Sequence, residues 1–119
     1  MSATKAGRAS GYVPQRGDAV WLTFDPQAGR EQAGRRPAVV LSPEAYNRKT
    51  GLALFSPITN SVKGYPFEVL LPSGLPIAGA VLSDHVKSLD WRARKAHLIC
   101  RLPGEVVRRI LQRVVLLLG

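Results

Sequence analysis

The chain has 119 residues, 45% of them apolar, which suffices for one domain with a single modest hydrophobic core. Seventeen Lys and Arg against eight Asp and Glu give a net charge of +9, which favours a polyanionic partner such as nucleic acid, an anionic membrane surface or an acidic protein. No apolar run approaches the ~18 residues of a membrane span. The N-terminal residues do not predict a secretory signal, and the single cysteine, Cys100, excludes an internal disulfide and suits a reducing cytoplasm.

The first half of the chain predicts a tail, two strands and a long connection between them. Residues 1–11 are expected to be a flexible basic tail, and residues 12–119 a single domain. The β-branched and aromatic residues of 18–24 predict a strand, and the apolar run 38–41 between two prolines predicts a buried one. The connection from Asp25 to Pro37 is longer than a tight hairpin and carries two glycines and three arginines. Long connections of this kind are usually functional or disordered, and this one is typical of a site.

The second half predicts short strands and one terminal helix. Pro43–Asn47 permits one helical turn, with Ser42 as N-cap and Pro43 at the first helical position. Apolar residues at three- and four-residue spacing from Val107 to Leu118 predict an amphipathic helix. Further strands are predicted at residues 52–59, 67–71, 79–82, 86–89 and 97–102, with a polar loop over 60–66. The fold class is therefore mainly β: a small antiparallel barrel or curled sheet capped by helices.

The sequence contains residue types that commonly bind metal ions or form catalytic motifs, but they lack the spacing that those roles require. His85 and His97 are far apart, and neither stands in a ligand spacing with Cys100, so we expect no metal and no cofactor. For both histidines a structural role is the favoured interpretation. Gly29 and Gly34 lack the Lys-Ser/Thr of a phosphate-binding loop, and no serine sits in a nucleophile-elbow pattern.

An arginine-centred site remains. Arg35 and Arg36 end the long connection, directly before Pro37 fixes the entry into the buried strand. An arginine anchored in this way loses little freedom on binding a phosphate, and its planar fork matches the phosphate oxygens. Surface ion pairs with Glu31 or Asp25 are an equally good explanation on the sequence alone.

Hydroxyl and aromatic side chains lie beside the two polar connections. Ser56 and Thr59 close the third strand, where a hydroxyl could donate to a developing oxyanion, although capping a strand end is its commoner use. Aromatic side chains beside basic loops can stack unpaired bases, but each is more often a core residue. The aromatic residues in these positions are Phe24, Tyr65, Phe67 and Trp91.

Three blocks of the sequence together resemble the MazF/PemK family of toxin endoribonucleases from type II toxin–antitoxin modules. The blocks are W-L-T-F-D-P…G-R-E-Q-A-G-R-R-P-A-V-V-L-S-P…Y-N…T-G-L, then S-P-I-T-N…K-G-Y-P-F-E-V, then D-H-V-K-S-L-D-W-R-A-R. They follow the family order, and the resemblance covers the chain from about Tyr12 to the C-terminus.

The resemblance implies an SH3-like antiparallel barrel, a homodimer with RNA bound along its interface, and metal-independent cleavage of single-stranded mRNA at a short sequence. It also implies an antitoxin that lays an acidic tail over the RNA site. The residues that it ties to catalysis are Arg36, from the G-x-R-P element, and Thr59, which ends the third strand. Glu31, the acid of the E-Q element, is implicated less uniformly, and Arg35 stands where some relatives carry histidine.

These assignments make chemical sense for attack by the RNA's own 2′-hydroxyl, which leaves a 2′,3′-cyclic phosphate and a 5′-hydroxyl. Arg36 and Thr59 can stabilise the phosphorane with preorganised donors. A pKa above ~12 makes arginine a poor base, so Glu31 is the more natural proton acceptor. Lys63, Lys87 and Arg35 are expected to bind phosphates. The residues expected to shape base pockets are Phe24, Asn60, Ser83 and Asp84.

Two other functions compete with RNA cleavage. A relative of the same fold that poisons DNA gyrase would cut nothing, and that class lacks the arginine of the E-Q-x-G-x-R-P element. A non-catalytic RNA-binding module would bind RNA in a salt-dependent way without making new ends. The broad apolar stripe of the terminal helix predicts dimerisation through this helix or the adjoining strands.

Overall fold

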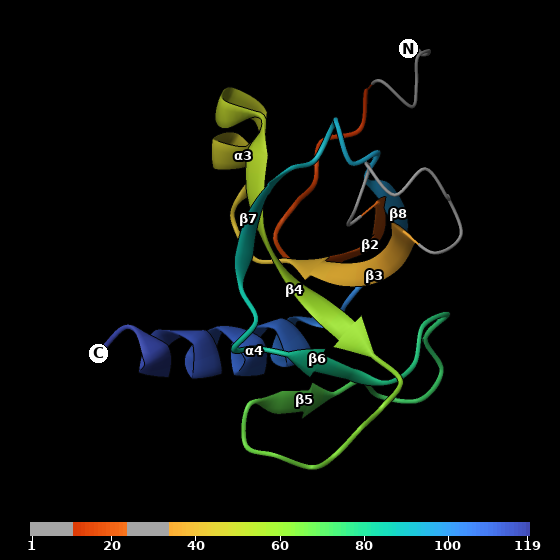
Figure 1. The fold of residues 1–119 in the computed structure, drawn as a ribbon, viewed down its shortest axis with the longest axis vertical. Coiled ribbons are helices and arrows are strands. Elements are labelled where there is room, and N and C mark those ends of the chain that lie inside the picture. The colour runs from red at the N-terminus through yellow and green to blue at the C-terminus, as the bar shows by residue number, and fades with distance from the viewer. Residues whose placement is uncertain (1–10, 24–33) are drawn as a thin grey trace.

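The most apolar segments of the sequence form the middle of one antiparallel sheet in the computed structural model, which describes residues 11–23 and 34–119 (Figure 1). The sheet has seven strands in the order β5-β6-β4-β3-β2-β8, and β7 pairs with β4 beside this path. The strands are β2 (Asp18–Thr23), β3 (Arg35–Val40), β4 (Leu52–Thr59), β5 (Glu68–Leu70), β6 (Ala80–Leu82), β7 (Lys87–Asp90) and β8 (His97–Arg101). The helices are α3 (Glu44–Thr50) and α4 (Gly104–Leu117).

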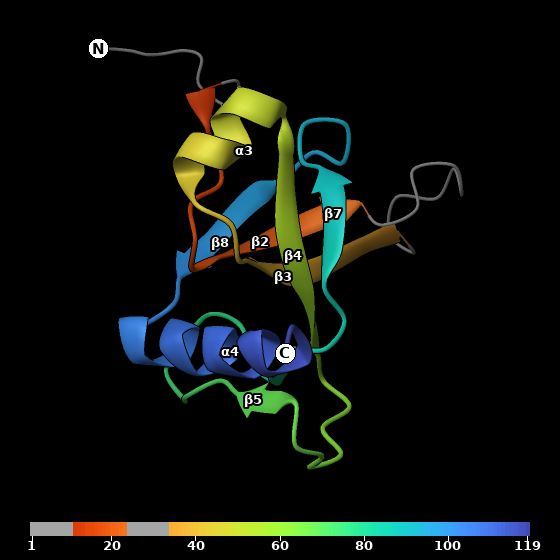
Figure 2. The same cartoon turned by 90° about the vertical axis from the view of Figure 1, so that its left-hand side faces the viewer.

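Strand β4 connects the two halves of the molecule. Its first half pairs with β7, so that Phe55 lies opposite Lys87, and its second half pairs with β6, so that Thr59 lies opposite Ala80. Figure 2 shows β4 running past β2 and β3 and on toward the layer that contains β5 and α4. Strands β5 and β8 stand at the two ends of the pairing path, so the described sheet is curled but open. The expected fold class is confirmed, with an open sheet in place of a closed barrel.

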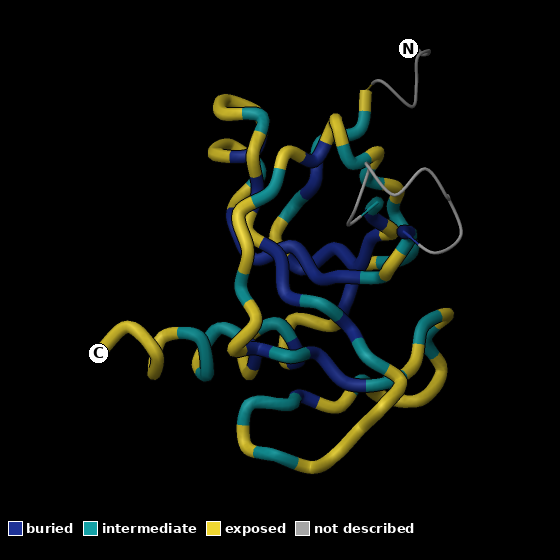
Figure 3. The backbone as a smooth tube through the Cα atoms, viewed as in Figure 1, coloured by how far each residue is buried: buried dark blue, intermediate teal, exposed yellow. Residues whose placement is uncertain are grey.

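Two hydrophobic cores lie on opposite faces of β2 and β3. Because both faces of these strands are buried, their sequences are continuously apolar. Ala19 and Val39 face a core that includes Ile110 of α4. Their neighbours along the strands face a second core that includes Phe55 and Trp91. Figure 3 shows the buried backbone concentrated in these central strands. The predictions of a buried strand over 38–41 and of an amphipathic terminal helix are therefore confirmed.

The largest difference from the sequence prediction concerns where β3 begins. The strand starts at Arg35, which pairs with Thr23, while Arg36 pairs with Leu22. The two arginines thus belong to the strand and not to the end of the long connection. Their charge suggested a loop, but at the end of a sheet a charged side chain can reach solvent while its backbone stays paired. The rest of that connection, residues 24–33, lies outside the described residues, as do residues 1–10 of the predicted tail.

The first helix also differs in its start. Helix α3 begins at Glu44, and its N-cap is Pro43, with no capping hydrogen bond from a side chain. The hydroxyl of Ser42, predicted as the cap, instead donates to Oδ1 of the buried Asn47 at 2.6 Å. Asn47 in turn donates to the carbonyl of Pro14 at 2.8 Å. The buried amide competes successfully for the hydroxyl because an unpaired amide inside the protein would be costly.

Within residues 11–23 and 34–119, neither helix is long and apolar enough to cross a membrane.

Candidate active site

A pocket of about 690 Å³ opens where the paired ends of β2 and β3 meet the end of β4. Arg36 and Thr59, the two residues that the sequence analysis ties most closely to catalysis, both line it. Strand pairing explains why they meet. Ala38 pairs with Pro57, and Arg36 lies two residues before the first while Thr59 lies two residues after the second. The antiparallel register therefore carries both side chains to the same end of the sheet.

Arg36 is the exposed cation of the pocket. Its backbone is fixed by the pairing with Leu22, but its side chain is exposed. Within the described part of the chain no hydrogen bond or ion pair of its guanidinium is found, so its donors can be aimed at a ligand. A guanidinium in this setting presents fixed positive charge and forked donors to an anion such as a phosphate.

Thr59 lines the pocket from the end of β4, with its hydroxyl already oriented. Its Oγ1 accepts a hydrogen bond from the backbone N–H of Ser61 at 3.0 Å. This bond is the strand-end cap considered in the sequence analysis. It uses a lone pair of the oxygen and leaves the hydroxyl proton for donation to another group. The capping role and the donor role are therefore compatible.

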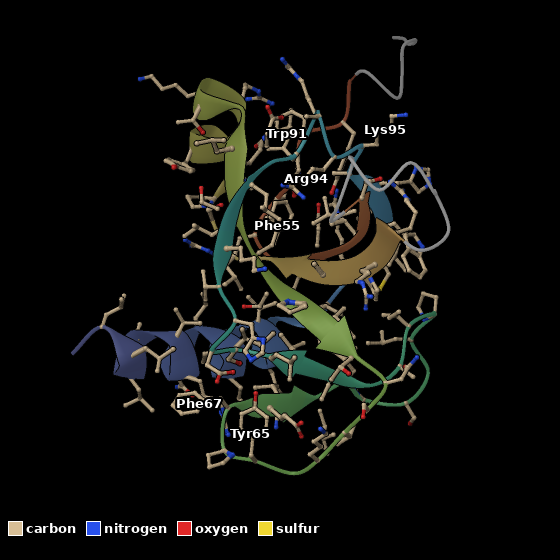
Figure 4. All side chains as sticks on the ribbon, in the orientation of Figure 1. Phe55, Tyr65, Phe67, Trp91, Arg94 and Lys95 are labelled. Atoms are coloured by element: carbon tan, nitrogen blue, oxygen red, sulfur yellow. The ribbon has the colours of Figure 1, made fainter. Side chains whose placement is uncertain are left out.

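Arg35 lines the pocket too, but its side chain is engaged within the protein. Its Nη1 donates to Oγ1 of Thr23 at 3.0 Å and to the carbonyl of Lys95 at 3.1 Å. A longer contact of 3.5 Å reaches the carbonyl of Arg94. Figure 4 labels Arg94 and Lys95 on the turn that provides these carbonyls. The ion-pair alternative considered for this arginine, with Asp25 or Glu31, falls on residues outside the described ranges.

The remaining predicted site residues are divided between the pocket and its surroundings. Asn60 lines the pocket, next to Thr59. Lys63, Asp84 and Lys87 are exposed, but they do not line it. Ser83 requires a correction, because it is 0% exposed and its hydroxyl is buried, so it does not present a surface to a base.

Two further predictions, for Phe24 and Glu31, fall on residues that the structure does not describe. The proton acceptor suggested by the sequence is one of them.

Most of the pocket wall is apolar, and the sequence analysis did not identify it. Trp21 lies between two buried residues of β2 and is itself 37% exposed. Its neighbours in the sequence are apolar as well, so nothing marked it as a pocket residue. The others reach the pocket through tertiary pairing, which leaves no local pattern. The apolar lining consists of Trp21, Pro37, Pro57, Ile58, Ile77 and Leu82.

The second polar loop, residues 60–67, is held beside the pocket by hydrogen bonds from three directions. The carboxylate of Glu68 accepts from the backbone N–H groups of Lys63 at 3.1 Å and Gly64 at 2.7 Å. The Tyr65 hydroxyl donates to Oδ1 of Asp84 at 3.1 Å. Nε of Arg113, from α4, donates to the carbonyl of Pro66 at 3.0 Å.

Tyr65 is the residue of this loop whose pKa is shifted. Desolvation, followed by the hydrogen bond to Asp84 and its negative charge, raises the pKa of the Tyr65 phenol above its ordinary value. The phenol therefore remains a donor at neutral pH. No group of three or more His, Cys, Asp or Glu side chains that could hold a metal ion occurs in the described ranges 11–23 and 34–119.

Comparison with known proteins places the chain among related toxins. A family described as PemK-like, MazF-like toxin of type II toxin–antitoxin system matches residues 15–118. The endoribonuclease toxin MazF of Escherichia coli K12 is 51% identical over 110 residues, which cover 92% of this chain and 98% of that protein. The crystal structure of MazF from Deinococcus radiodurans (Form-I) superposes with a TM-score of 0.82 at 54% identity, covering 91% of this chain and 98% of the other. A MazE–MazF complex from the same organism gives a TM-score of 0.81 at 48% identity, with 91% and 97% covered.

Proposed function

We propose that this chain, which belongs to the PemK/MazF family of toxins of type II toxin–antitoxin systems, is an endoribonuclease that cuts single-stranded mRNA without a metal ion. The observation that carries the proposal is the single pocket that Arg36 and Thr59 both line. A positively charged fork together with an oriented hydroxyl fits a phosphodiester group. The relatives named as endoribonucleases favour cleavage over both a gyrase poison and a non-catalytic RNA-binding module.

The proposed chemistry is attack of the RNA 2′-hydroxyl on the adjacent phosphorus. The bond to the 5′-oxygen of the next nucleotide then breaks, which leaves a 2′,3′-cyclic phosphate and a 5′-hydroxyl. Arg36 holds the non-bridging oxygens as negative charge develops on them, and the Thr59 hydroxyl donates to the same group. Arg36 is also proposed to donate the proton that the leaving oxygen needs, and Glu31 is the proposed acceptor of the 2′-hydroxyl proton.

Single-stranded RNA is proposed to extend from the pocket over the neighbouring polar surface. Lys63 and Lys87 are exposed cations outside the pocket lining and are proposed to bind phosphates. Asn60 and Phe24 are proposed to contact bases, and Asp84 to border the base-binding surface. The apolar wall around Trp21 gives unpaired bases a surface on which to stack.

A homodimer is proposed from the apolar end of α4. Four successive apolar residues there are 47–81% exposed, which is an unusual density of exposed apolar residues for a solvated helix end. These residues are Val115, Leu116, Leu117 and Leu118. A monomer at micromolar concentration, measured by light scattering after size-exclusion chromatography, would contradict the dimer.

An antitoxin with an acidic segment is the proposed protein partner, in the cytoplasm where mRNA is translated. The support is the net charge of +9 together with the MazE–MazF complex among the structural relatives. An acidic tail that lies over Arg36 and the exposed lysines would compete directly with RNA.

The test is cleavage of a mixed-sequence RNA in EDTA, followed by sequencing of the new 5′-hydroxyl ends, which also gives the recognition sequence. Wild-type protein should cut at a short motif, and Arg36→Ala should lower the rate about 10²–10³-fold, as loss of a transition-state donor does. Arg48→Ala, on the exposed face of α3, is the matched arginine control and should cut normally. Intact RNA with the wild type would favour the gyrase-poison or RNA-binding alternatives.

A further inference from the structure

Arg35 and the turn between β7 and β8 form a connection that ties the outer end of the β2–β3 pair to a distant part of the chain. The N–H of Thr23 donates to the carbonyl of Arg94 at 2.9 Å, and Nη1 of Arg94 donates back to the carbonyl of Thr23 at 3.2 Å. Arg35, which pairs with Thr23, adds its own bonds to Thr23 Oγ1 and to the carbonyl of Lys95. Two strand ends and one turn are thereby joined at a single place.

The turn is shaped to receive this arginine. Lys95 has a φ of 55°, and among the described residues it is the one position other than glycine with a positive φ. A lysine pays conformational energy in the left-handed region, which persists only where surrounding bonds enforce it. Its carbonyl accepts from Arg35 at 3.1 Å, and its N–H donates to the carbonyl of Arg92 at 3.0 Å. The strained residue therefore lies directly at the contact with Arg35.

The acceptors also indicate the role of the side chain. Oxygens that accept from Arg35 are neutral carbonyls and a hydroxyl, and they lie up to 60 residues away in the sequence. Such acceptors hold the direction of the guanidinium without cancelling its charge. All three contacts of Arg35 use one nitrogen, Nη1, and they hold the guanidinium against the turn. The guanidinium of Arg36, in contrast, makes no such contact within the described part of the chain.

We infer that Arg35 is a positioning residue: it fixes the end of β3 against the 94–95 turn and thereby sets the position of Arg36 at the pocket. The inference rests on the proposed function, and it replaces the phosphate-binding role that the sequence suggested for Arg35. The adjacent Arg36 has no side-chain bond of its own within residues 11–23 and 34–119, so its placement depends on the backbone that carries it. Arg35 holds that backbone from the neighbouring residue.

The experiment compares Arg35→Gln with wild type on an RNA that contains the mapped cleavage motif. Misplacing a reacting group by about an ångström costs roughly 10- to 100-fold in rate, so kcat should fall by that factor while KM changes little. Arg48→Gln makes the same charge change on α3 and should leave both constants unchanged. Folding of each variant is checked by thermal unfolding.

Salt dependence separates positioning from phosphate binding. Affinity is measured with an RNA whose scissile 2′-hydroxyl is methylated, so that it binds without being cut. A lost phosphate contact would reduce the slope of log K against log salt by about 0.7 for single-stranded RNA. We expect Arg35→Gln to keep the wild-type slope. A reduced slope with a raised KM and an intact kcat would overturn the inference.

Thr23→Val tests the same connection from its other side and remains informative if Arg35→Gln does not fold. It removes one acceptor of Arg35 while keeping side-chain volume and charge, so kcat should fall by a smaller factor in the same direction. In the double variant the two losses should be less than additive, because both remove one contact. Wild-type kcat in both single variants would overturn the inference while leaving cleavage itself intact. A wild-type protein that cuts no RNA would instead overturn the proposed function.

Discussion

The two sides of the pocket are held in different ways. On one side Arg36 stands on β3, with its side chain unbonded within the described residues and its backbone held through Arg35 and strand pairing. On the other side Thr59 is itself hydrogen-bonded, and the loop that follows is capped by Glu68. The β3 side of the pocket therefore has a cation with no side-chain bond among the described residues on a fixed backbone, whereas the β4 side has an oriented hydroxyl within a network of bonds.

This difference shows how a site built on an arginine and a hydroxyl can be preorganised. A guanidinium needs no partner to remain charged, so fixing its strand is sufficient. A hydroxyl has no permanent charge and rotates freely, so its usefulness as a donor depends on a bond that orients it. We therefore expect substitutions on the Thr59 side to disturb geometry in graded steps, according to how far each lies from the hydroxyl.

Removing the hydroxyl itself should have the largest effect. Thr59→Val keeps the shape of the side chain but removes the donor, so kcat should fall about 10²–10³-fold with little change in KM. Loss of the bond to the Ser61 N–H should also lower the free energy of unfolding by about 1 kcal/mol. Thr59→Ser retains the hydroxyl and is the control. Single-turnover cleavage is measured for both variants. If the valine variant were active, Thr59 would have no part in the mechanism.

The next largest effect is expected at Gly79, which lies against the end of β4. A Cβ added there would stand 2.2 Å from the carbonyl oxygen of Thr59, and its φ is +122°. The alanine variant must move the backbone of Thr59, so we expect destabilisation on the order of 3 kcal/mol and at least about a tenfold loss of kcat.

Gly74 provides a matched control for Gly79. Its φ is +94°, but a Cβ there would meet nothing within 4 Å. Gly74→Ala should therefore show the conformational cost without the loss of activity. Thermal unfolding and single-turnover cleavage are measured for both. Equal losses of activity in the two variants would show that the contact with Thr59 is not the cause.

The contrast between Gly79 and the central strands shows what the sequence could reveal. The apolar run from Ala38 to Leu41 and the spacing of the terminal helix report burial directly, because hydrophobic periodicity reflects the environment of each side chain. A glycine in a proline-rich connection gives no sign that another strand's carbonyl lies against it. That contact exists only after β6 has paired with β4.

The same reasoning applies to the two arginines. The sequence marked Arg35 and Arg36 alike as candidate phosphate ligands, since both precede Pro37 and carry the same charge. The structure separates them through the carbonyls of Arg94 and Lys95. Backbone carbonyls are present at every residue, so they leave no pattern in the sequence. Residue chemistry made Arg36 and Thr59 candidates among others, and the family resemblance singled them out as catalytic. The strand register then explains why they meet.

A smaller effect is expected from Glu68, which holds the loop one step further from the hydroxyl. Its two carboxylate oxygens accept from Lys63 and Gly64, and the glutamine variant would replace one acceptor with a donor that faces an N–H group. We expect a loss of about 1 kcal/mol in stability and a few-fold loss of cleavage, mainly as a higher KM. Glu105→Gln, in the first turn of α4, is the charge-matched control. A kcat as low as that of Gly79→Ala would contradict the graded order.

The smallest effect on activity is expected at Tyr65, whose bond to Asp84 is exposed to solvent. Surface contacts of this kind contribute little, so Tyr65→Phe should cut RNA within about twofold of the wild type at neutral pH. Its pH dependence is the more informative measurement. The pKa of the phenol is raised, so the folded state favours the protonated donor. The stabilisation is therefore fully present below the ordinary pKa of 10.0 and is lost as pH rises through the higher folded value.

The difference in stability between wild type and Tyr65→Phe should accordingly be constant up to that ordinary pKa and shrink above it. Thermal unfolding from neutral to alkaline pH tests the shift, and ultraviolet titration of the phenols identifies which one ionises late. Tyr12, whose pKa is also raised by burial and by its bond to Asp18, must be separated from Tyr65 by titrating Tyr12→Phe in parallel. If removing Tyr65 left the number of late-ionising phenols unchanged, the tie to Asp84 would not form in solution. The loop beside Thr59 would then be held by its other contacts, which include those of Glu68 and Arg113.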